Sequence, residues 1–223
     1  MLKSFLSINA LPESFDRFLI SKEVEFVKSH CGQYPVVSLD LKDCQGDTWD
    51  EMYHKIWRCI RKMVDDHKVE LADVIFELKT YGYNFSSPNP PVNSVFVSSL
   101  LSWLIENLSK YHKKNVIVLV DEYDAPLNCA FRKNFYDKAA SFFGQFYSKA
   151  LKGNSALEKA CLMGIVEVRG AGILSGLNNI GVYSVSHKKF SASFGFSKAE
   201  IEGLVNSETD IEKVYEWYNG YTI

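Results

Sequence analysis

The sequence predicts an α/β fold in which helices cover both faces of a parallel sheet. Five consecutive apolar residues, 116–120, run directly into Asp121 and Glu122, and such a short apolar run is typical of a strand buried on both faces. Residues 94–109 have the apolar spacing of an amphipathic helix and lead into this strand, which is one step of a helix and strand alternation. The chain has 223 residues, of which 47% are hydrophobic, enough to bury a substantial core.

The elements that precede this strand alternate in the same way. Residues 21–30 predict a short amphipathic helix, and the β-branched run at 34–41 predicts a strand. The sequence Asp-Thr-Trp-Asp-Glu at 47–51 is a capping pattern that opens a long helix. Residues 69–79 favour another helix, and 81–91 contain the glycine and prolines of a loop.

The elements that follow Asp124 continue the alternation and then become helical. We expect a turn at 125–128, a helix at 132–152, buried strands at 161–166 and 182–185, and short helices at 197–204 and 209–218. Ser197 and Thr209 are suitable N-cap residues for the last two helices.

Composition narrows the class of protein. A net charge of −2 and a pI near 6.2 give no general attraction to nucleic acid. The five cysteines contain no C-x-x-C pair, which argues against a disulfide framework and a structural zinc site. The five histidines are dispersed, so we expect surface or hydrogen-bonded side chains rather than metal ligands. Neither a signal peptide nor an apolar run of membrane-spanning length is present, and the sequence predicts a soluble, intracellular protein without a membrane segment.

The acids at the end of the 116–120 run are the best candidates for chemistry. In P-loop ATPases, the first acid after such a strand holds Mg²⁺, usually through water, and the second polarises the attacking water. Asp121 and Glu122 would take these roles. The same pattern also occurs where a strand simply ends in solvated charges, and the chain contains no G-x-x-x-x-G-K-[ST] phosphate loop.

Five sequence blocks carry a resemblance to a known family. They are NVIVLVDEYDAPL at 115–127, LEKACLMGI at 157–165, ILSGLNNIGVYSV at 173–185, FSASFGF at 190–196 and WYNGY at 217–221. In order and spacing they resemble the AAA-ATPase-like family, whose members are similar to P-loop ATPases and often carry a PD-(D/E)XK nuclease-like domain after the ATPase-like part.

The resemblance implies an incomplete P-loop NTPase-like parallel sheet flanked by helices, with a small helical C-terminal part. The segment Met-Leu-Lys-Ser-Phe at 1–5 is similar to the helix that follows the family's phosphate loop. By this alignment, residues 1–196 form an α/β domain that lacks the first strand and the loop, and 197–223 begin a helical subdomain. The neighbours of the lost strand would then have unpaired edges.

The resemblance also implies ligands and site residues. Mg²⁺ and ATP would be the cofactors, with Asp121 as the metal ligand and cofactor-binding residue and Glu122 as the catalytic residue. Met163 occupies the place of a common Thr and Glu167 that of a common Arg, so Arg169 is the remaining candidate for a phosphate contact. These departures, with the missing loop, predict a catalytically compromised module.

Two other functions stay open at this stage. One is an active ATPase completed by residues before Met1 or by a partner chain; a protein partner or a homo-oligomer is compatible with the resemblance. The other is a PD-(D/E)XK-type nuclease, for which Asp40-Leu41-Lys42 on a strand would place an acid and a lysine on one face.

Overall fold

The computed structural model describes residues 1–8, 10–165, 180–185, 187–190, 195–205 and 211–218. The chain divides into a unit comprising residues 1–178 and a smaller one comprising 179–223. The larger unit contains the sheet and the candidate site.

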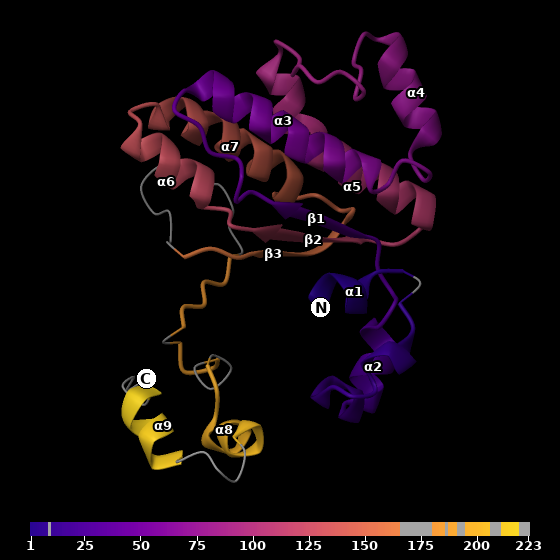
Figure 1. Ribbon diagram of the computed structural model, residues 1–223. Helices are drawn as coiled ribbons and strands as arrows, with labels where there is room; N and C mark the ends of the chain where they lie inside the picture. The colour runs from indigo at the N-terminus through magenta and orange to yellow at the C-terminus, as the bar shows by residue number, and fades with distance from the viewer. Residues whose placement is uncertain (9, 166–179, 186, 191–194, 206–210, 219–223) are drawn as a thin grey trace. The chain divides into compact units, whose positions relative to one another are not determined.

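The sheet has three parallel strands in the order β1-β2-β3 (Figure 1). The strands are β1 (Val36–Asp40), β2 (Val116–Asp121) and β3 (Leu157–Leu162). Asp40 and Asp121 are register partners at the carboxyl ends of β1 and β2. The predicted parallel α/β architecture is therefore confirmed.

Helices connect these strands and cover both sides of the sheet. The α-helices of the larger unit are α1 (Leu2–Leu6), α2 (Val24–His30), α3 (Trp49–Asp65), α4 (Ala72–Thr80), α5 (Ser94–His112), α6 (Ala125–Arg132) and α7 (Tyr136–Leu151). The 3-10 helices η1 (Pro12–Phe15) and η2 (Leu19–Lys22) lie between α1 and α2.

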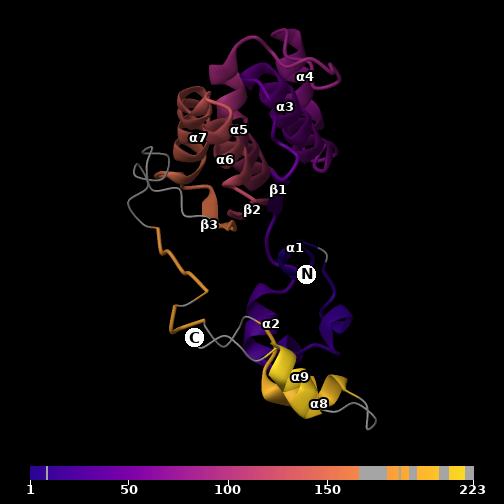
Figure 2. The same ribbon diagram turned by 60° about the vertical axis from the view of Figure 1, so that its left-hand side comes forward.

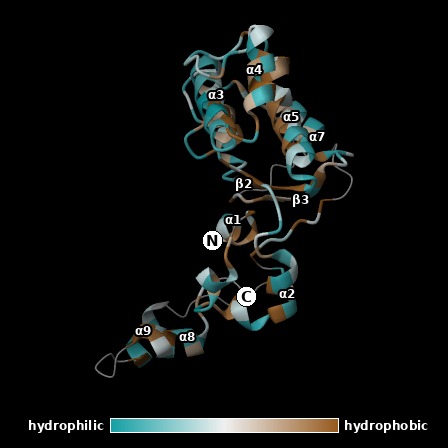
Figure 3. Cartoon of the chain, turned by 90° about the vertical axis from the view of Figure 1, so that its right-hand side faces the viewer, coloured by the Kyte–Doolittle hydropathy of each residue, from teal (hydrophilic) through white to brown (hydrophobic). Residues whose placement is uncertain are grey.

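Alternate residues of β2 enter two separate cores. Val116, Val118 and Val120 join the larger core, to which α3, α5 and α7 contribute, whereas Ile117 and Leu119 join a smaller core built by the N-terminal segment. Figure 2 shows α3, α5 and α7 on one side of the sheet and α1 and α2 on the other. In Figure 3, β2 is hydrophobic while α3 carries hydrophilic residues on its outer side. Such burial on both faces explains why β2 is apolar without alternation.

Side-chain caps define where α3 and α5, two helices that pack on the sheet, begin. The side chain of Thr48 accepts a hydrogen bond from the Glu51 N–H at 3.3 Å, which confirms the predicted start of α3. Asn93 caps α5 in the same way through the N–H of Phe96 at 3.1 Å.

Three predicted elements differ from the structure around the candidate site. Residues 125–128 were predicted as a turn between elements but form the first turn of the helix α6, because Pro126 lies where its missing N–H costs nothing. The helix predicted at 132–152 begins only at Tyr136, after a break in which Asn134 has a positive φ of 61°. The strand predicted at 161–166 lies at Leu157–Leu162 instead.

Strand β3 is also more exposed than predicted. Within the described residues it pairs only with β2, and Glu158, Lys159 and Cys161 are exposed. The expectation that Cys161 is buried was therefore wrong, because one face and the outer edge of this strand lack covering elements in the described part of the chain. Residues 182–185 were predicted as a strand but are not assigned to one.

The smaller unit contains two described helices, α8 (Lys198–Leu204) and α9 (Ile211–Tyr218). Ser197 caps the start of α8, as the sequence predicted, and forms a reciprocal capping box with Glu200. Thr209, the predicted cap of the next helix, lies outside the described residues. None of the described helices combines the length and apolar character that a membrane crossing requires.

Candidate functional site

The candidate site lies at the carboxyl edge of β1 and β2. The Asp121 carboxylate is exposed there beside the register partner Asp40. The N–H of Leu41 donates to the Asp121 carbonyl at 3.0 Å, which continues the pairing of the two strands to their last residues. In open α/β sheets, ligands bind at this edge. The fold therefore places Asp121, the predicted metal ligand, at the edge where a bound nucleotide and its metal ion would lie.

Glu122 has an unusual backbone conformation. Its φ of 54° lies in the left-handed region, which costs an L-residue about 1–2 kcal/mol. The Glu122 N–H donates to Oδ1 of Asp121 at 3.0 Å, and its carbonyl accepts from the N–H of Ala125 at 3.0 Å. These bonds turn the chain sharply out of β2 and leave the Glu122 side chain half-buried beside Asp121. Non-glycine residues held in this region are concentrated at functional sites.

Asp124 forms the buried floor behind this turn. It is only 2% exposed, and its Oδ2 accepts a hydrogen bond from Nδ2 of Asn128 at 2.9 Å. Gly164 approaches so closely that a Cβ there would collide with Oδ1 of Asp124 and would lie 2.8 Å from the ring of Tyr123. The D-E-Y-D sequence thus divides into two accessible acids, Asp121 and Glu122, and one structural acid.

Met163 joins the turn to the end of β3. Its N–H donates to the carbonyl of Val120 at 2.8 Å, and its carbonyl accepts from the N–H of Tyr123 at 3.1 Å. The Met163 side chain is 40% exposed at this edge, and a thioether cannot donate a hydrogen bond to a phosphate oxygen. Arg169 and Glu167, the other two positions singled out from the sequence, lie outside the described residues.

The acids at this edge suit a Mg²⁺ ion that is shared with a ligand. Within the described residues, no group of three or more His, Cys, Asp or Glu side chains is arranged to hold a metal ion. Mg²⁺, however, is usually held by one or two carboxylates together with substrate phosphates and water, rather than by a cage of protein ligands. Asp121 could supply one such carboxylate, with Mg²⁺ neutralising phosphate charge.

The geometry does not support the nuclease arrangement that the sequence suggested. Strand β1 ends at Asp40, and Lys42 lies in the turn that follows. Oδ1 of Asp40 accepts the backbone N–H of Lys42 at 2.9 Å, so the carboxylate caps a turn. The expectation that Asp40 and Lys42 share one face of a strand was therefore wrong.

The structure brings together acids and histidines that sequence spacing did not connect. Asp40 lies beside Asp121, a neighbour relation that could have been inferred from two parallel strands that both end in Asp. Nδ1 of His67 and Nε2 of His112 lie 3.7 and 3.9 Å from Oε1 of Glu70. His67 Nδ1 is buried and lies beyond hydrogen-bond distance of Glu70, so its contact with this carboxylate is electrostatic.

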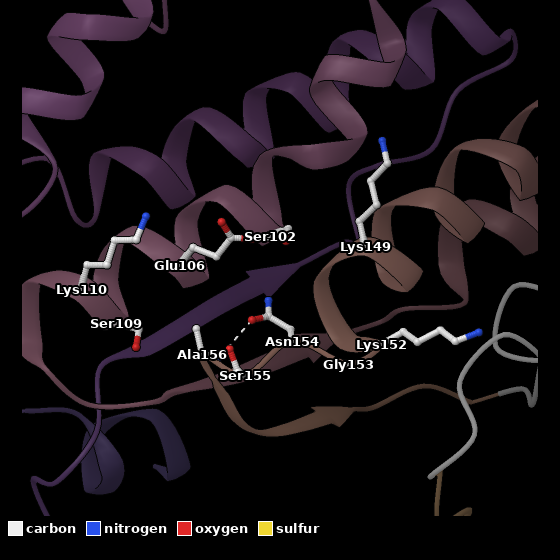
Figure 4. Close-up of a pocket in the computed structure, with 10 residues that line it drawn as sticks. All are labelled: Ser102, Glu106, Ser109, Lys110, Lys149, Lys152, Gly153, Asn154, Ser155 and Ala156. Carbon is white, nitrogen blue, oxygen red and sulfur yellow. Dashed lines mark hydrogen bonds between the residues drawn. The ribbon is translucent and has the colours of Figure 1, made fainter.

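A polar pocket lies at the other, amino-terminal edge of the sheet. It has a volume of about 540 Å³, and Figure 4 shows its lining residues on α5, on α7 and in the segment before β3. Glu106 accepts from the Ser102 hydroxyl at 2.9 Å, and Nζ of Lys149 donates to the Val95 carbonyl at 3.2 Å. In Figure 4 the ammonium groups of Lys110, Lys149 and Lys152 lie apart from one another, so the pocket does not concentrate positive charge at one point.

The fold and the site define an α/β protein whose central parallel strand ends in accessible acids. A model of the AAA-ATPase-like family, described as "Predicted AAA-ATPase", matches residues 1–174. The chain belongs to this family. A similar curated protein, from Azotobacter chroococcum mcd 1, is described as "Uncharacterized protein in vnfD 5'region" and is 30% identical over 112 residues. This match covers 48% of the chain and 22% of the relative, so the aligned part spans about a fifth of that protein. No solved structure matches the chain.

Proposed function

We propose that this chain is an AAA-ATPase-like module with the Mg²⁺ and water-activating half of a nucleotide site and little hydrolytic activity of its own. Asp121 would hold Mg²⁺ and Glu122 would orient the attacking water. The observation that carries the proposal is the pair of accessible carboxylates at the carboxyl end of the central strand, with Glu122 in the left-handed conformation.

Two features support these roles. Asp121 is exposed at the sheet edge where α/β proteins bind ligands, and its Oδ1 is oriented by the N–H of Glu122. Glu122 is anchored on the opposite side by the hydrogen bond from Ala125 to its carbonyl. A general base must be held within reach of the water it polarises, and these bonds restrict the backbone from which the Glu122 carboxylate extends.

The low activity that we propose for this chain rests on phosphate contacts that its 223 residues do not supply. The 223 residues contain no Gly-Lys pair and hence no phosphate loop. Each charge-assisted hydrogen bond that such a loop supplies is worth about 1.5–3 kcal/mol. The loss of several would weaken ATP binding by orders of magnitude, while Mg²⁺ alone would be held only weakly by Asp121.

Calorimetric titration with Mg-ATP and a phosphate-release assay test the proposal on the full chain. We expect weak Mg-ATP binding that Asp121→Asn weakens further, with phosphate release at background in the wild type. Asp73→Asn, which changes an exposed acid on α4, is the matched control and should bind like the wild type.

Three results would change this assignment. Tight Mg-ATP binding, with phosphate release that Glu122→Gln abolishes, would show an active enzyme. Binding that is equal in Asp121→Asn, Asp73→Asn and the wild type would remove Asp121 from the site. Hydrolysis that appears only when residues encoded upstream of Met1, or a partner chain, are added would support the completed ATPase instead.

A further inference from the structure

Two of the five thiols lie together behind the end of β1. Cys44 is buried in the turn after β1, where its N–H donates to the carbonyl of Leu41 at 2.9 Å. Cys59 is a half-buried residue of α3 whose Sγ donates to the carbonyl of Asp40 at 3.4 Å. Asp40 and Leu41 are consecutive, so both cysteines lie at the same turn, where each thiol shifts the pKa of the other. The fold therefore joins two cysteines that are widely separated in the sequence.

We propose that Cys44 and Cys59 form a reversible disulfide when the protein meets hydrogen peroxide. The Cys59 thiolate attacks one peroxide oxygen, the O–O bond breaks, and the leaving hydroxide takes a proton to become water. The Cys44 sulfur then attacks the resulting sulfenic acid, the S–O bond breaks, and a second water leaves. The two thiols lose two electrons and peroxide gains them.

The environments of the two thiols suit these different roles. Cys59 is the more accessible of the two, so peroxide reaches its sulfur before that of Cys44. Cys44 is buried, and the neighbouring Cys59 thiol together with burial raises its pKa, so this residue stays protonated until a sulfenic acid forms beside it. Solvent-accessible cysteines next to a second thiol are typical of reversible oxidation.

The disulfide would constrain the turn after β1, which lies at the carboxyl edge of the sheet and contacts α6. The turn that contains Cys44 leads to Gly46, whose carbonyl accepts a hydrogen bond from Sγ of Cys129 at 3.3 Å. Asp47 then forms an ion pair with Lys133 at 2.6 Å. A covalent bond from Cys44 to α3 would constrain this connection between β1, α3 and α6.

Peptide mapping of the full chain tests the proposal directly. After reduction, the protein is treated with hydrogen peroxide, its remaining thiols are alkylated, and it is digested with trypsin without reductant. The expected product joins the peptides Asp43–Lys55 and Cys59–Arg61, with a mass lower by two hydrogen atoms than their sum, and dithiothreitol separates them. The midpoint of thermal unfolding should rise on oxidation and return on reduction, since a cross-link restricts the unfolded chain.

The control variant is Cys161→Ser, which removes the exposed thiol on β3 and should leave the cross-link unchanged. In Cys59→Ser, Cys44 should stay reduced under the same treatment, and in Cys44→Ser, Cys59 should form sulfenic acid or higher oxides without a partner. The proposal is overturned if the wild type oxidises Cys59 without joining it to Cys44. It is equally overturned if Cys161 or Cys31 is consumed while both Cys44 and Cys59 remain reduced.

Discussion

At the scale of single residues, Glu122 is a position where the backbone conformation favours glycine but the chain carries a carboxylate. A residue chosen only for stability at φ 54° would be glycine or asparagine, because neither resists the left-handed region as strongly as glutamate. A carboxylate held there at a cost indicates that the side chain contributes something besides folding.

This conflict predicts the effect of Glu122→Gly. The free energy of unfolding should stay unchanged or rise by up to about 1 kcal/mol, because relief of the left-handed strain outweighs or balances the greater entropy of an unfolded glycine. Urea denaturation measures this difference. Glu122→Gln keeps the strain and serves as the control; a large destabilisation in Glu122→Gly alone would show that the Glu122 side chain supports the fold.

Tyr147 offers a second test at this scale. Its ring is fully buried and its hydroxyl lacks a hydrogen-bond partner, while burial raises its pKa. Burial of an unsatisfied hydroxyl costs about 1–3 kcal/mol, so Tyr147→Phe should raise the free energy of unfolding by about 1 kcal/mol. An unchanged or lower stability in chemical denaturation would mean that a water molecule satisfies the hydroxyl.

At the scale of elements, α3 and the turn before it connect the candidate site with the core. The helix buries Met52, Ile56 and Ile60 against the sheet, and its start is defined by Thr48. Since the preceding turn carries Cys44, a shift in this start would also move the thiol pair.

Thr48→Ala should therefore lower the free energy of unfolding by about 1 kcal/mol, because the N–H of Glu51 loses its side-chain acceptor. Thr48→Ser keeps the acceptor and should retain most of the stability. The comparison by thermal or urea unfolding separates capping from a general effect of substitution, and equal losses in the two variants would argue against the cap.

At the scale of the whole molecule, His67 links regions that are far apart in the sequence. It lies just after α3, in a small pocket with Lys3 from α1, Asp66, Glu70 and His112 at the end of α5. Burial lowers the pKa of His67, against the opposing influence of Glu70 and Asp66. The folded protein therefore favours the neutral imidazole more than the unfolded chain does.

The sign of the pH dependence follows from this difference. The unfolded chain binds a proton at His67 more readily, with a pKa near 6.5, so the stability from the neutral form is complete above that pH and falls as the pH drops through it. His67→Gln should make the loss of stability between neutral and mildly acidic pH less steep. Exposed His54 provides the control variant His54→Gln, which should keep the wild-type slope; identical slopes in all three proteins would exclude His67.

Periodic, local signals were sufficient to predict much of the fold. The apolar runs predicted β1 and β2, and the Thr48 and Ser197 caps predicted where α3 and α8 begin, because capping and buried-strand patterns depend on neighbouring residues. The α6 helix was missed because Pro126 was interpreted as a turn residue, although proline is equally suited to the first turn of a helix. The exposure of β3 was missed because it depends on which elements cover the strand, and no local sequence pattern contains that information.

The sequence alone was enough to identify Asp121 and Glu122 as the candidate acids, because a buried strand that ends in carboxylates is a local pattern. Only the tertiary structure placed Asp40 in register with Asp121, brought Cys44 to Cys59, and gathered His67, Glu70 and His112 in one pocket. These contacts join residues from different strands and helices, so they depend on strand register and helix packing. Strand period and capping act within a few residues of the chain, whereas register and packing are decided by the shared burial of distant apolar faces.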